Sequence, residues 1–145
     1  MNMNKLMISN RVLDSIKTHL EVSAPYVAGG FFLANLTKDQ AEVVDFKPAL
    51  NIIDGIPNQF LYSSEDFELT TVLGHQRALQ VSGVYASVSS KDYAPEQLFV
   101  NKAENNTYYL VGVIQNNELV GVDAYHYTSD AFNKCSLAMV EALEV

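Results

Sequence analysis

The side chains that could bind a metal or act as a nucleophile are few and lie far apart in the sequence. The three histidines are His19, His75 and His126, and no two of them have the His-x-His or His-x-x-x-His spacing of metal ligands. Cys135, the single cysteine, would need a histidine beside it to become a reactive thiolate, and it falls on an apolar stripe. Ser87 has no base among its sequence neighbours. We therefore expect surface or half-buried histidines, a buried structural thiol and a strand-end hydroxyl.

Helices and strands alternate along the chain in an order that indicates how these side chains are held. Apolar residues recur at helical spacing in three segments, which predict helices at about 10–20, 64–80 and 129–143. Alternating or continuous apolar runs predict strands at 29–34, 41–47, 60–62, 81–88, 108–114 and 119–127. The tight strand–helix–strand repeat of a doubly wound fold is missing. The sequence therefore predicts an α/β (α+β) class fold, with a mixed, mostly antiparallel, curved sheet flanked by three helices.

Each predicted helix has its own set of candidate core residues. The first helix begins at a Ser9-Asn10 cap and has apolar residues at Val12, Leu13, Ile16 and Leu20. The candidates of the middle helix are Phe67, Val72, Leu73 and Leu79, and those of the last helix are Phe132, Cys135, Met139 and Leu143. Gly74 weakens the middle helix by roughly 1 kcal/mol relative to Ala, so we expect something to pack closely there.

The run from Gly83 to Val88 carries a family resemblance. Gly83, Tyr85 and Ser87 match the frame of Gly-x-Tyr-His-Ser-His, the zinc-binding strand end of the JAB/MPN (JAMM) metalloproteases, which this chain resembles. The match extends over about residues 5–127, from the Leu-x-Ile-Ser pattern that begins at Leu6 through the strand at 108–114. The resemblance implies a single domain over 1–145 with a JAB/MPN-like (deaminase-like) architecture.

The catalytic positions of that family hold apolar residues here. In the family, two His and one Asp hold zinc, and the metal lowers the pKa of a bound water whose proton a Glu accepts. Ala86 and Val88 stand at the His positions, Phe99 at the Asp position and Val27 at the Glu position, whereas Ser87 is kept. Hydrocarbon side chains have no lone pair for a metal. The resemblance therefore implies a degenerate member with no metal, no cofactor and no catalytic residue.

A non-catalytic protein-binding or assembly module is the function that this resemblance implies. Metal-free members of the family pair with other MPN domains, so the expected partner is a protein or a second copy, in a heterodimer or homodimer. We expect a binding groove around Tyr85, Ser87, Asp92 and Tyr93 that takes an extended segment. Two alternatives stay open: a peptide or isopeptide hydrolase with a relocated site that uses Asp92, Ser87 or a histidine, and a small-ligand-binding protein that uses the emptied apolar pocket.

Composition limits the partners and the compartment. The chain of 145 residues is 48% hydrophobic and 18% charged, as in a single globular domain. Nine Lys and Arg against 17 Asp and Glu give a net charge of −8, which disfavours nucleic acid and anionic membrane surfaces as main partners. No apolar run reaches the roughly 18 residues of a membrane span. With one cysteine and no recognisable export signal, we expect a cytoplasmic protein.

Overall fold

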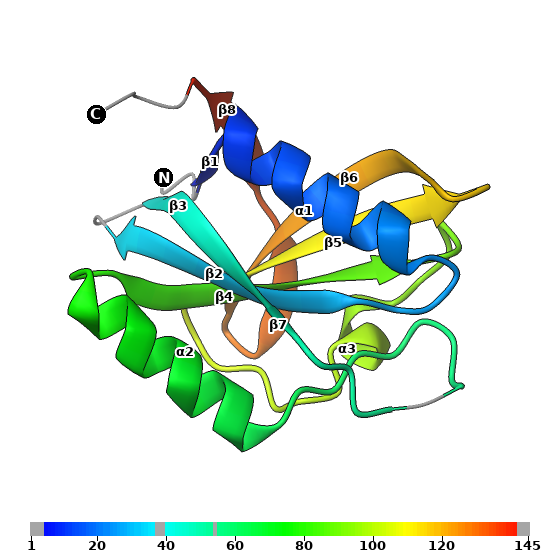
Figure 1. Ribbon diagram of the computed structural model, residues 1–145, viewed down its shortest axis with the longest axis horizontal. Coiled ribbons are helices and arrows are strands. Elements are labelled where there is room, and N and C mark those ends of the chain that lie inside the picture. The colour runs from blue at the N-terminus through cyan, green and yellow to red at the C-terminus, as the bar shows by residue number, and fades with distance from the viewer. Residues whose placement is uncertain (1–4, 37–39, 54, 142–145) are drawn as a thin grey trace.

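In the part of the chain that the structure describes, eight strands form one curved sheet, and three helices pack against it (Figure 1). The computed structural model describes residues 5–36, 40–53 and 55–141. The strands, named in chain order, are β1 (Lys5–Ser9), β2 (Gly29–Leu36), β3 (Gln40–Ala49), β4 (Gln80–Val88), β5 (Thr107–Gln115), β6 (Glu118–Thr128), β7 (Ala131–Lys134) and β8 (Ser136–Val140). Their order across the sheet is β7-β6-β5-β4-β2-β3-β1-β8. The predicted α+β class is confirmed.

Antiparallel pairing dominates the sheet, as the sequence predicts. The pairs β2–β3, β2–β4, β5–β6 and β6–β7 are antiparallel, whereas β4–β5, β1–β3 and β1–β8 are parallel. The helices are α1 (Asn10–Ser23), α2 (Ser64–Gln76) and the short α3 (Pro95–Leu98). None of the described helices is long and apolar enough to cross a membrane.

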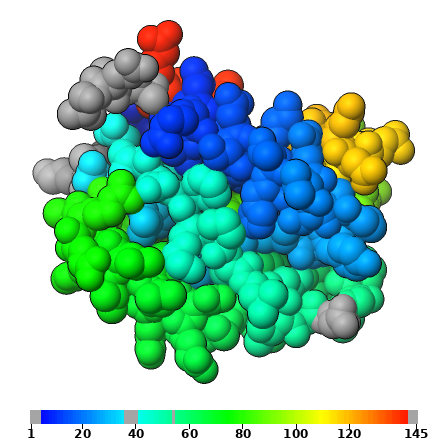
Figure 2. All heavy atoms as spheres, in the orientation of Figure 1, coloured from blue at the N-terminus to red at the C-terminus, as the bar shows by residue number. Residues whose placement is uncertain are grey.

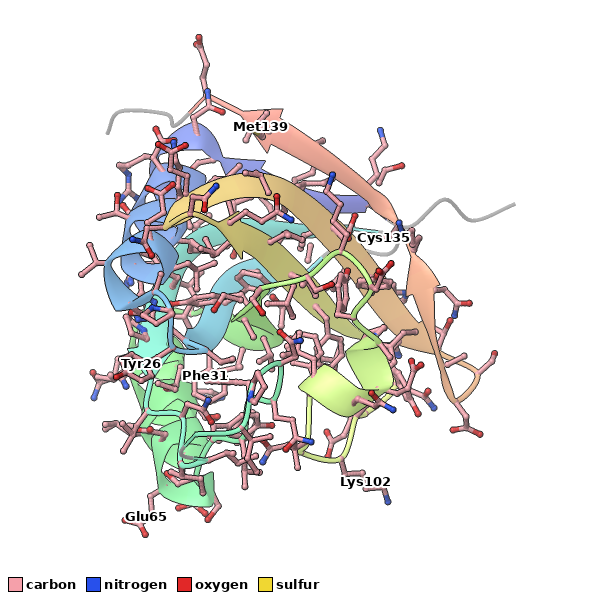
Figure 3. All side chains as sticks on the ribbon, turned by 90° about the vertical axis from the view of Figure 1, so that its right-hand side faces the viewer. Tyr26, Phe31, Glu65, Lys102, Cys135 and Met139 are labelled. Atoms are coloured by element: carbon pink, nitrogen blue, oxygen red, sulfur yellow. The ribbon has the colours of Figure 1, made fainter. Side chains whose placement is uncertain are left out.

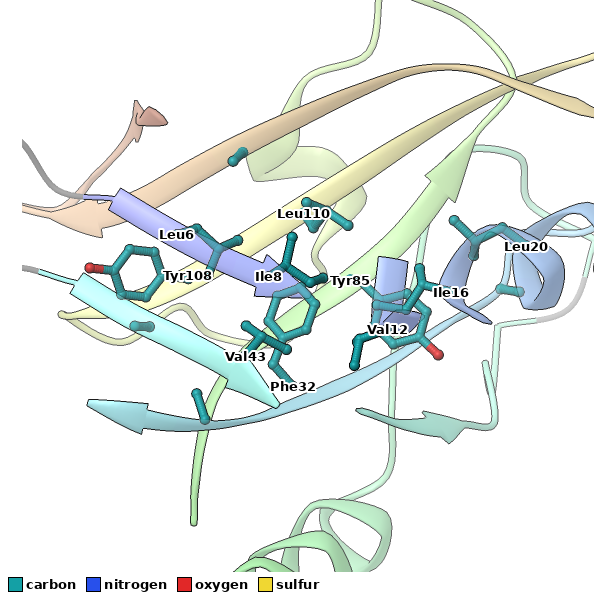
Figure 4. Close-up of a cluster of buried hydrophobic side chains, with 14 of the residues drawn as sticks. Leu6, Ile8, Val12, Ile16, Leu20, Phe32, Val43, Tyr85, Tyr108 and Leu110 are labelled. Carbon is teal, nitrogen blue, oxygen red and sulfur yellow. The ribbon is translucent and has the colours of Figure 1, made fainter. Parts of the chain in front are cut away.

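Helix α1 forms where its sequence signals place it. The Ser9 side chain accepts a hydrogen bond from the Val12 backbone N–H at 3.1 Å, which caps the helix. Val12, Ile16 and Leu20 are buried at helical spacing and pack on one face of the sheet. This face holds one hydrophobic cluster, which also includes Leu6, Phe32 and Tyr85 (Figure 4).

A second hydrophobic cluster lies on the other face of the sheet. It holds Phe31, Phe60, Val84, Ala86, Val88, Leu98, Phe99, Tyr109, Val111, Val113 and Tyr125. Helix α2 also packs against strands β2 and β4. Because strand residues alternate between faces, neighbouring β4 residues such as Tyr85 and Ala86 enter different clusters.

The prediction that α2 buries its apolar residues is wrong. Phe67, Val72 and Leu73 are exposed, and the buried helix residues are Thr70 and Gly74. A Cβ on Gly74 would lie 3.0 Å from Leu33 Cδ2 and 3.1 Å from the Leu79 carbonyl oxygen, so the expected close packing at Gly74 is confirmed. Small residues bring the helix against the sheet and leave Val72 and Leu73 outside, whereas the partly exposed Phe67 ring contacts those of Phe31 and Tyr62. Leu79, just before β4, is buried as predicted.

The predicted helix over 129–143 is also wrong, because this segment forms β7 and β8. Strand β8 pairs in parallel with β1, in register from Lys5↔Ser136 to Ser9↔Val140. Such long-range pairing leaves no local signal in the sequence. Met139 is exposed rather than in the core, and residues 142–143 of the predicted helix lie outside the described part of the chain.

Smaller differences occur in two other places. The predicted strand at 60–62 is reduced to one parallel bridge between Phe60 and Phe99. The sequence patterns predicted neither β1 nor α3 as separate elements.

Candidate functional site

Three of the four positions that the predicted resemblance assigns to zinc chemistry lie in one hydrophobic cluster, and the fourth packs against it. Ala86 and Val88 point to the same face of β4, and both belong to the second hydrophobic cluster with Phe99. Val27, half-buried, packs against that cluster. These four residues therefore share one apolar cluster, which leaves the family resemblance itself untested.

Aromatic rings fill the space beside these positions. The Phe99 ring lies 4.6 Å from that of Tyr109 and is stacked on that of Phe132 at 6.2 Å. The gap that remains between Phe60, Val84, Phe99 and their neighbours has no room for a water molecule. Val27, Ala86, Val88 and Phe99 offer no lone pair, so these residues do not fit a zinc ion. Packed side chains therefore fill the space around Phe99, whereas Val27 and Val88 also line a surface hollow.

Ser87 uses its polar groups to join two segments of the sheet. Its Oγ accepts a hydrogen bond from the Ala28 N–H at 3.1 Å, and its own N–H donates to the Ala28 carbonyl oxygen at 2.9 Å. The side chain is buried. The kept hydroxyl therefore holds the end of β4 against the residues that precede β2.

Tyr85 does not line a groove, so its prediction as a binding residue is wrong. The side chain is fully buried beneath α1, where its hydroxyl lies 2.9 Å from His19 Nδ1 (Figure 4). Burial raises the pKa of Tyr85 above its usual range and lowers the pKa of His19 below its ordinary value of 6.5. Both side chains are therefore neutral at pH 7.

Tyr93 and Asp92, although adjacent in the sequence, lie in different environments. The Tyr93 hydroxyl donates to Asp123 Oδ2 at 2.7 Å and lies 2.6 Å from the Tyr125 hydroxyl. Burial, followed by the hydrogen bonds to Tyr125 and Asp123, raises the pKa of Tyr93. Asp92 is exposed on the loop before it. The four residues of the predicted groove therefore do not form one surface.

A surface hollow that the sequence analysis missed lies between the end of α1 and the loop after β3. Its volume is about 730 Å³, and its lining includes His19, Val22, Tyr26, Leu50, Asn51 and Ile56. Val22, Tyr26 and Leu50 are 79%, 73% and 70% exposed, which is unusual for apolar residues that lie close together. Figure 2 shows the end of α1 and this loop side by side on the surface, and Figure 3 labels Tyr26.

A second hollow lies on the other side of Tyr26. Its volume is about 450 Å³, and it shares Ala24, Pro25, Tyr26, Val27 and Pro57 with the first hollow. The rest of its lining is Asn58, residues 87–89, and residues 114–117 at the end of β5 and in the turn that follows. Tyr26 therefore forms a ridge between two hollows. We call the two hollows and this ridge the Tyr26 surface.

Asn51 fixes the loop that forms one wall of this surface. Its Nδ2 donates to the carbonyl oxygens of Val27 and Gln59 at 3.2 and 3.0 Å. Its Oδ1 accepts from the backbone N–H groups of Ile53 and Leu61, both at 3.1 Å. One side chain thus ties three segments together. The sequence signal for this role of Asn51 is its position just after a Pro-containing strand end.

The remaining reactive side chains lie apart from one another. His19 is in α1, His75 in α2 and His126 in β6. His126 is buried and stacked on Tyr108, so the expectation of surface or half-buried histidines fails there. Among the described residues, no three His, Cys, Asp or Glu side chains gather as a metal site would need. Cys135 is half-buried, and burial raises its pKa to about 11.

Comparison with known proteins shows the fold alone. No protein-family model and no curated protein sequence matches the chain. The solution structure of protein DSY2949 from Desulfitobacterium hafniense is similar with a TM-score of 0.73 at 16% identity, over 96% of this chain and 95% of that one. A solution structure of a Salinibacter ruber protein is similar with a TM-score of 0.68 at 18% identity, over 96% of each chain. The chain therefore shares a whole-domain α+β fold with two bacterial proteins whose names state no activity.

Proposed function

We propose that this protein is a non-catalytic, degenerate JAB/MPN-like domain that binds another protein through the Tyr26 surface. The observation that carries the proposal is the packing of Val27, Ala86, Val88 and Phe99 into one apolar cluster. A hydrolase of the related family needs lone pairs and a proton acceptor at these positions. Hydrocarbon supplies neither.

The relocated hydrolase gains no support from the residues that it would use. The Ser87 hydroxyl is hydrogen-bonded to the Ala28 N–H, Asp92 is exposed, and the three histidines lie on separate elements. A serine nucleophile needs a base within hydrogen-bonding reach, and Ser87 has no such partner among the described residues.

The shape of the Tyr26 surface favours an extended peptide segment as its ligand. Successive side chains of an extended segment point in opposite directions. Residues i and i+2 of such a segment therefore point to the same side. When the segment crosses the Tyr26 ridge, one of these two side chains can enter each hollow. The tyrosine ring offers a large apolar contact with a hydroxyl at its tip, as is common at protein interfaces.

A displayed library of random peptides tests this proposal, because such a library requires no particular partner. We expect selected peptides to carry two apolar residues separated by one position, and to bind at least about tenfold more weakly to a Tyr26→Ala variant. Val120→Ala, an exposed substitution in β6, is the matched control and should leave binding unchanged. Peptides that bind both variants equally would overturn the assignment of the surface.

Measurement of metal and hydrolysis tests the non-catalytic half of the proposal. Protein purified without chelator should hold much less than one zinc per chain and should not cleave peptide or isopeptide substrates. Stoichiometric zinc together with zinc-dependent cleavage would overturn the proposal, whatever the peptide library shows.

A further inference from the structure

Helix α2 presents its apolar side chains to solvent. Leu69, Val72 and Leu73 recur at spacings of three and four residues, which places them on one face of the helix. They are 50%, 54% and 38% exposed, whereas Thr70 and Gly74 face the sheet. In Figure 1 α2 lies at the margin of the molecule, with no other element outside it. This outer face is called the α2 stripe.

From this stripe we propose that two copies of the chain associate through antiparallel pairing of their α2 helices about a two-fold axis. The inference goes beyond the proposed function, because the α2 stripe and the Tyr26 surface are separate. A two-fold dimer uses the same patch on both copies, so the patch must be complementary to itself. The stripe meets that requirement in two ways. Its apolar side chains can pack against the same side chains of the second copy, and the polar side chains beside it match across a two-fold axis.

Hydrogen-bonding side chains on one flank of the stripe are arranged for antiparallel pairing. Glu68 and His75 are both exposed and lie seven residues apart, which is close to two helical turns and places them on the same flank. The midpoint of this pair lies between Thr71 and Val72, about 5 Å along the helix from each. An axis at that point brings Glu68 of each copy opposite His75 of the other copy. In a parallel pair the Glu68 flank of one copy would instead face the opposite flank of the other copy, so Glu68 and His75 would not meet.

The other flank neither favours nor opposes this arrangement. Asp66 lies 4.0 Å from Lys47 Nζ, and Arg77 is paired with Asp45. Each end of this flank therefore carries a balanced pair of charges. Glu65 and Glu68 make no ion pair with any described residue, so Glu68 is available to the imidazole of the second copy.

The length of α2 limits the strength of the dimer. Thirteen residues give a helix of about 20 Å, and packing along that length buries less than the roughly 800 Å² per partner of a standard interface. We expect a dissociation constant between about 1 µM and about 1 mM.

Sedimentation equilibrium of the full chain over that concentration range tests the pairing. Wild-type protein should show a monomer–dimer equilibrium, and Val72→Glu should weaken it at least about tenfold, because two carboxylates would then meet beside the axis. Val120→Glu introduces the same charge at an exposed position in β6 and should leave the equilibrium unchanged. Tyr26→Ala should also leave it unchanged, which separates this inference from the proposed function.

A charge exchange tests the orientation of the two helices. Glu68→Lys and His75→Glu should each weaken the dimer, and the double variant should restore it to within about threefold of wild type. Within one chain the two positions are about 10 Å apart along the helix, so rescue would report a contact between copies. Circular dichroism should show unchanged helix content in every variant.

Three results would overturn the inference. The first is a protein that stays monomeric throughout the concentration range. This result would overturn the inference even if a basic amphipathic peptide bound to α2 instead. The second is a dimer that Val72→Glu leaves intact, because the interface then lies elsewhere. The third is a folded double variant that fails to regain the dimer, which would exclude the antiparallel arrangement.

Discussion

Ser87 and Ala28 exchange two hydrogen bonds at the point where β4 meets the segment that precedes β2. The Ser87 hydroxyl accepts from the Ala28 N–H at 3.1 Å, and the Ser87 N–H donates to the Ala28 carbonyl oxygen at 2.9 Å. The hydroxyl thus satisfies a buried backbone donor that has no strand partner of its own. These two hydrogen bonds give Ser87 a structural role.

Ser82 on the same strand gives a matched comparison. Both serines are buried, at 3% exposure for Ser87 and 4% for Ser82, but Ser82 Oγ has no hydrogen-bond partner among the described residues. Ser87→Ala should lower the free energy of unfolding by about 1–3 kcal/mol, because it leaves the Ala28 N–H unpaired. Ser82→Ala should be neutral or stabilising. Urea titration of the two variants measures the difference, and equal losses would contradict the role assigned to Ser87.

The Asn51 side chain should be needed for the shape of the Tyr26 surface. Asn51→Asp keeps the acceptor for Ile53 and Leu61, but it places a carboxylate oxygen against the carbonyl oxygens of Val27 and Gln59. We expect a loss of about 1–3 kcal/mol in the free energy of unfolding. Asn105→Asp, at an exposed position, adds the same charge and is the control. Comparable losses in both variants would show that added charge alone causes the effect.

Local signals predicted the parts of the fold that are fixed locally. The Ser9 cap and the spacing of Val12, Ile16 and Leu20 suffice for α1, because capping and amphipathic periodicity act within a few residues. Strand β8 depends on β1, about 130 residues away, and the apolar spacing from Phe132 to Met139 imitates that of a helix. Periodicity alone could not show that partner.

The candidate site could be predicted only in part for a similar reason. Ala86, Val88 and Phe99 lie in one apolar cluster and Val27 packs against it, but this packing does not test the family resemblance that grouped them. The Tyr26 surface is formed by the end of α1 and by the loop after β3, so its apolar residues are adjacent only after folding. On α2, an apolar face looks the same in sequence whether it covers a core or faces solvent.

Phe99 should contribute to stability as a core residue. Phe99→Ala leaves a cavity among Phe60, Tyr109 and Phe132 and should cost about 3–5 kcal/mol. Val100→Ala, at the exposed neighbouring position, should cost less than about 1 kcal/mol. Thermal or urea unfolding measures both values. A small loss for Phe99→Ala would show that the cluster does not depend on this ring.

Acid should destabilise the fold through His19. Burial lowers the pKa of His19 below its ordinary value of 6.5, so the unfolded chain binds more protons than the folded one. Stability should therefore fall as pH decreases through 6.5 towards the lower folded-state pKa and level off once both states are protonated. His126, with its pKa lowered by burial, acts in the same direction. Urea titrations between about pH 7.5 and pH 5 should show a smaller loss in His19→Asn than in wild type. Identical pH dependence in the two proteins would contradict the assignment to His19.

Cys135 should react slowly with thiol reagents in the folded protein. Burial raises its pKa to about 11, and its ordinary value is 9.0. At pH 8 the thiolate fraction is then about 100-fold smaller than in the unfolded chain, and the thiolate is the species that reacts. Reaction with a disulfide reagent at pH 8 should therefore be at least about 100-fold slower in native buffer than in concentrated urea. In native buffer, the rate should rise about tenfold from pH 8 to pH 9. A native rate equal to the rate in urea would show that the thiol is neither shielded nor shifted, and that β7 and β8 do not hold it against the sheet.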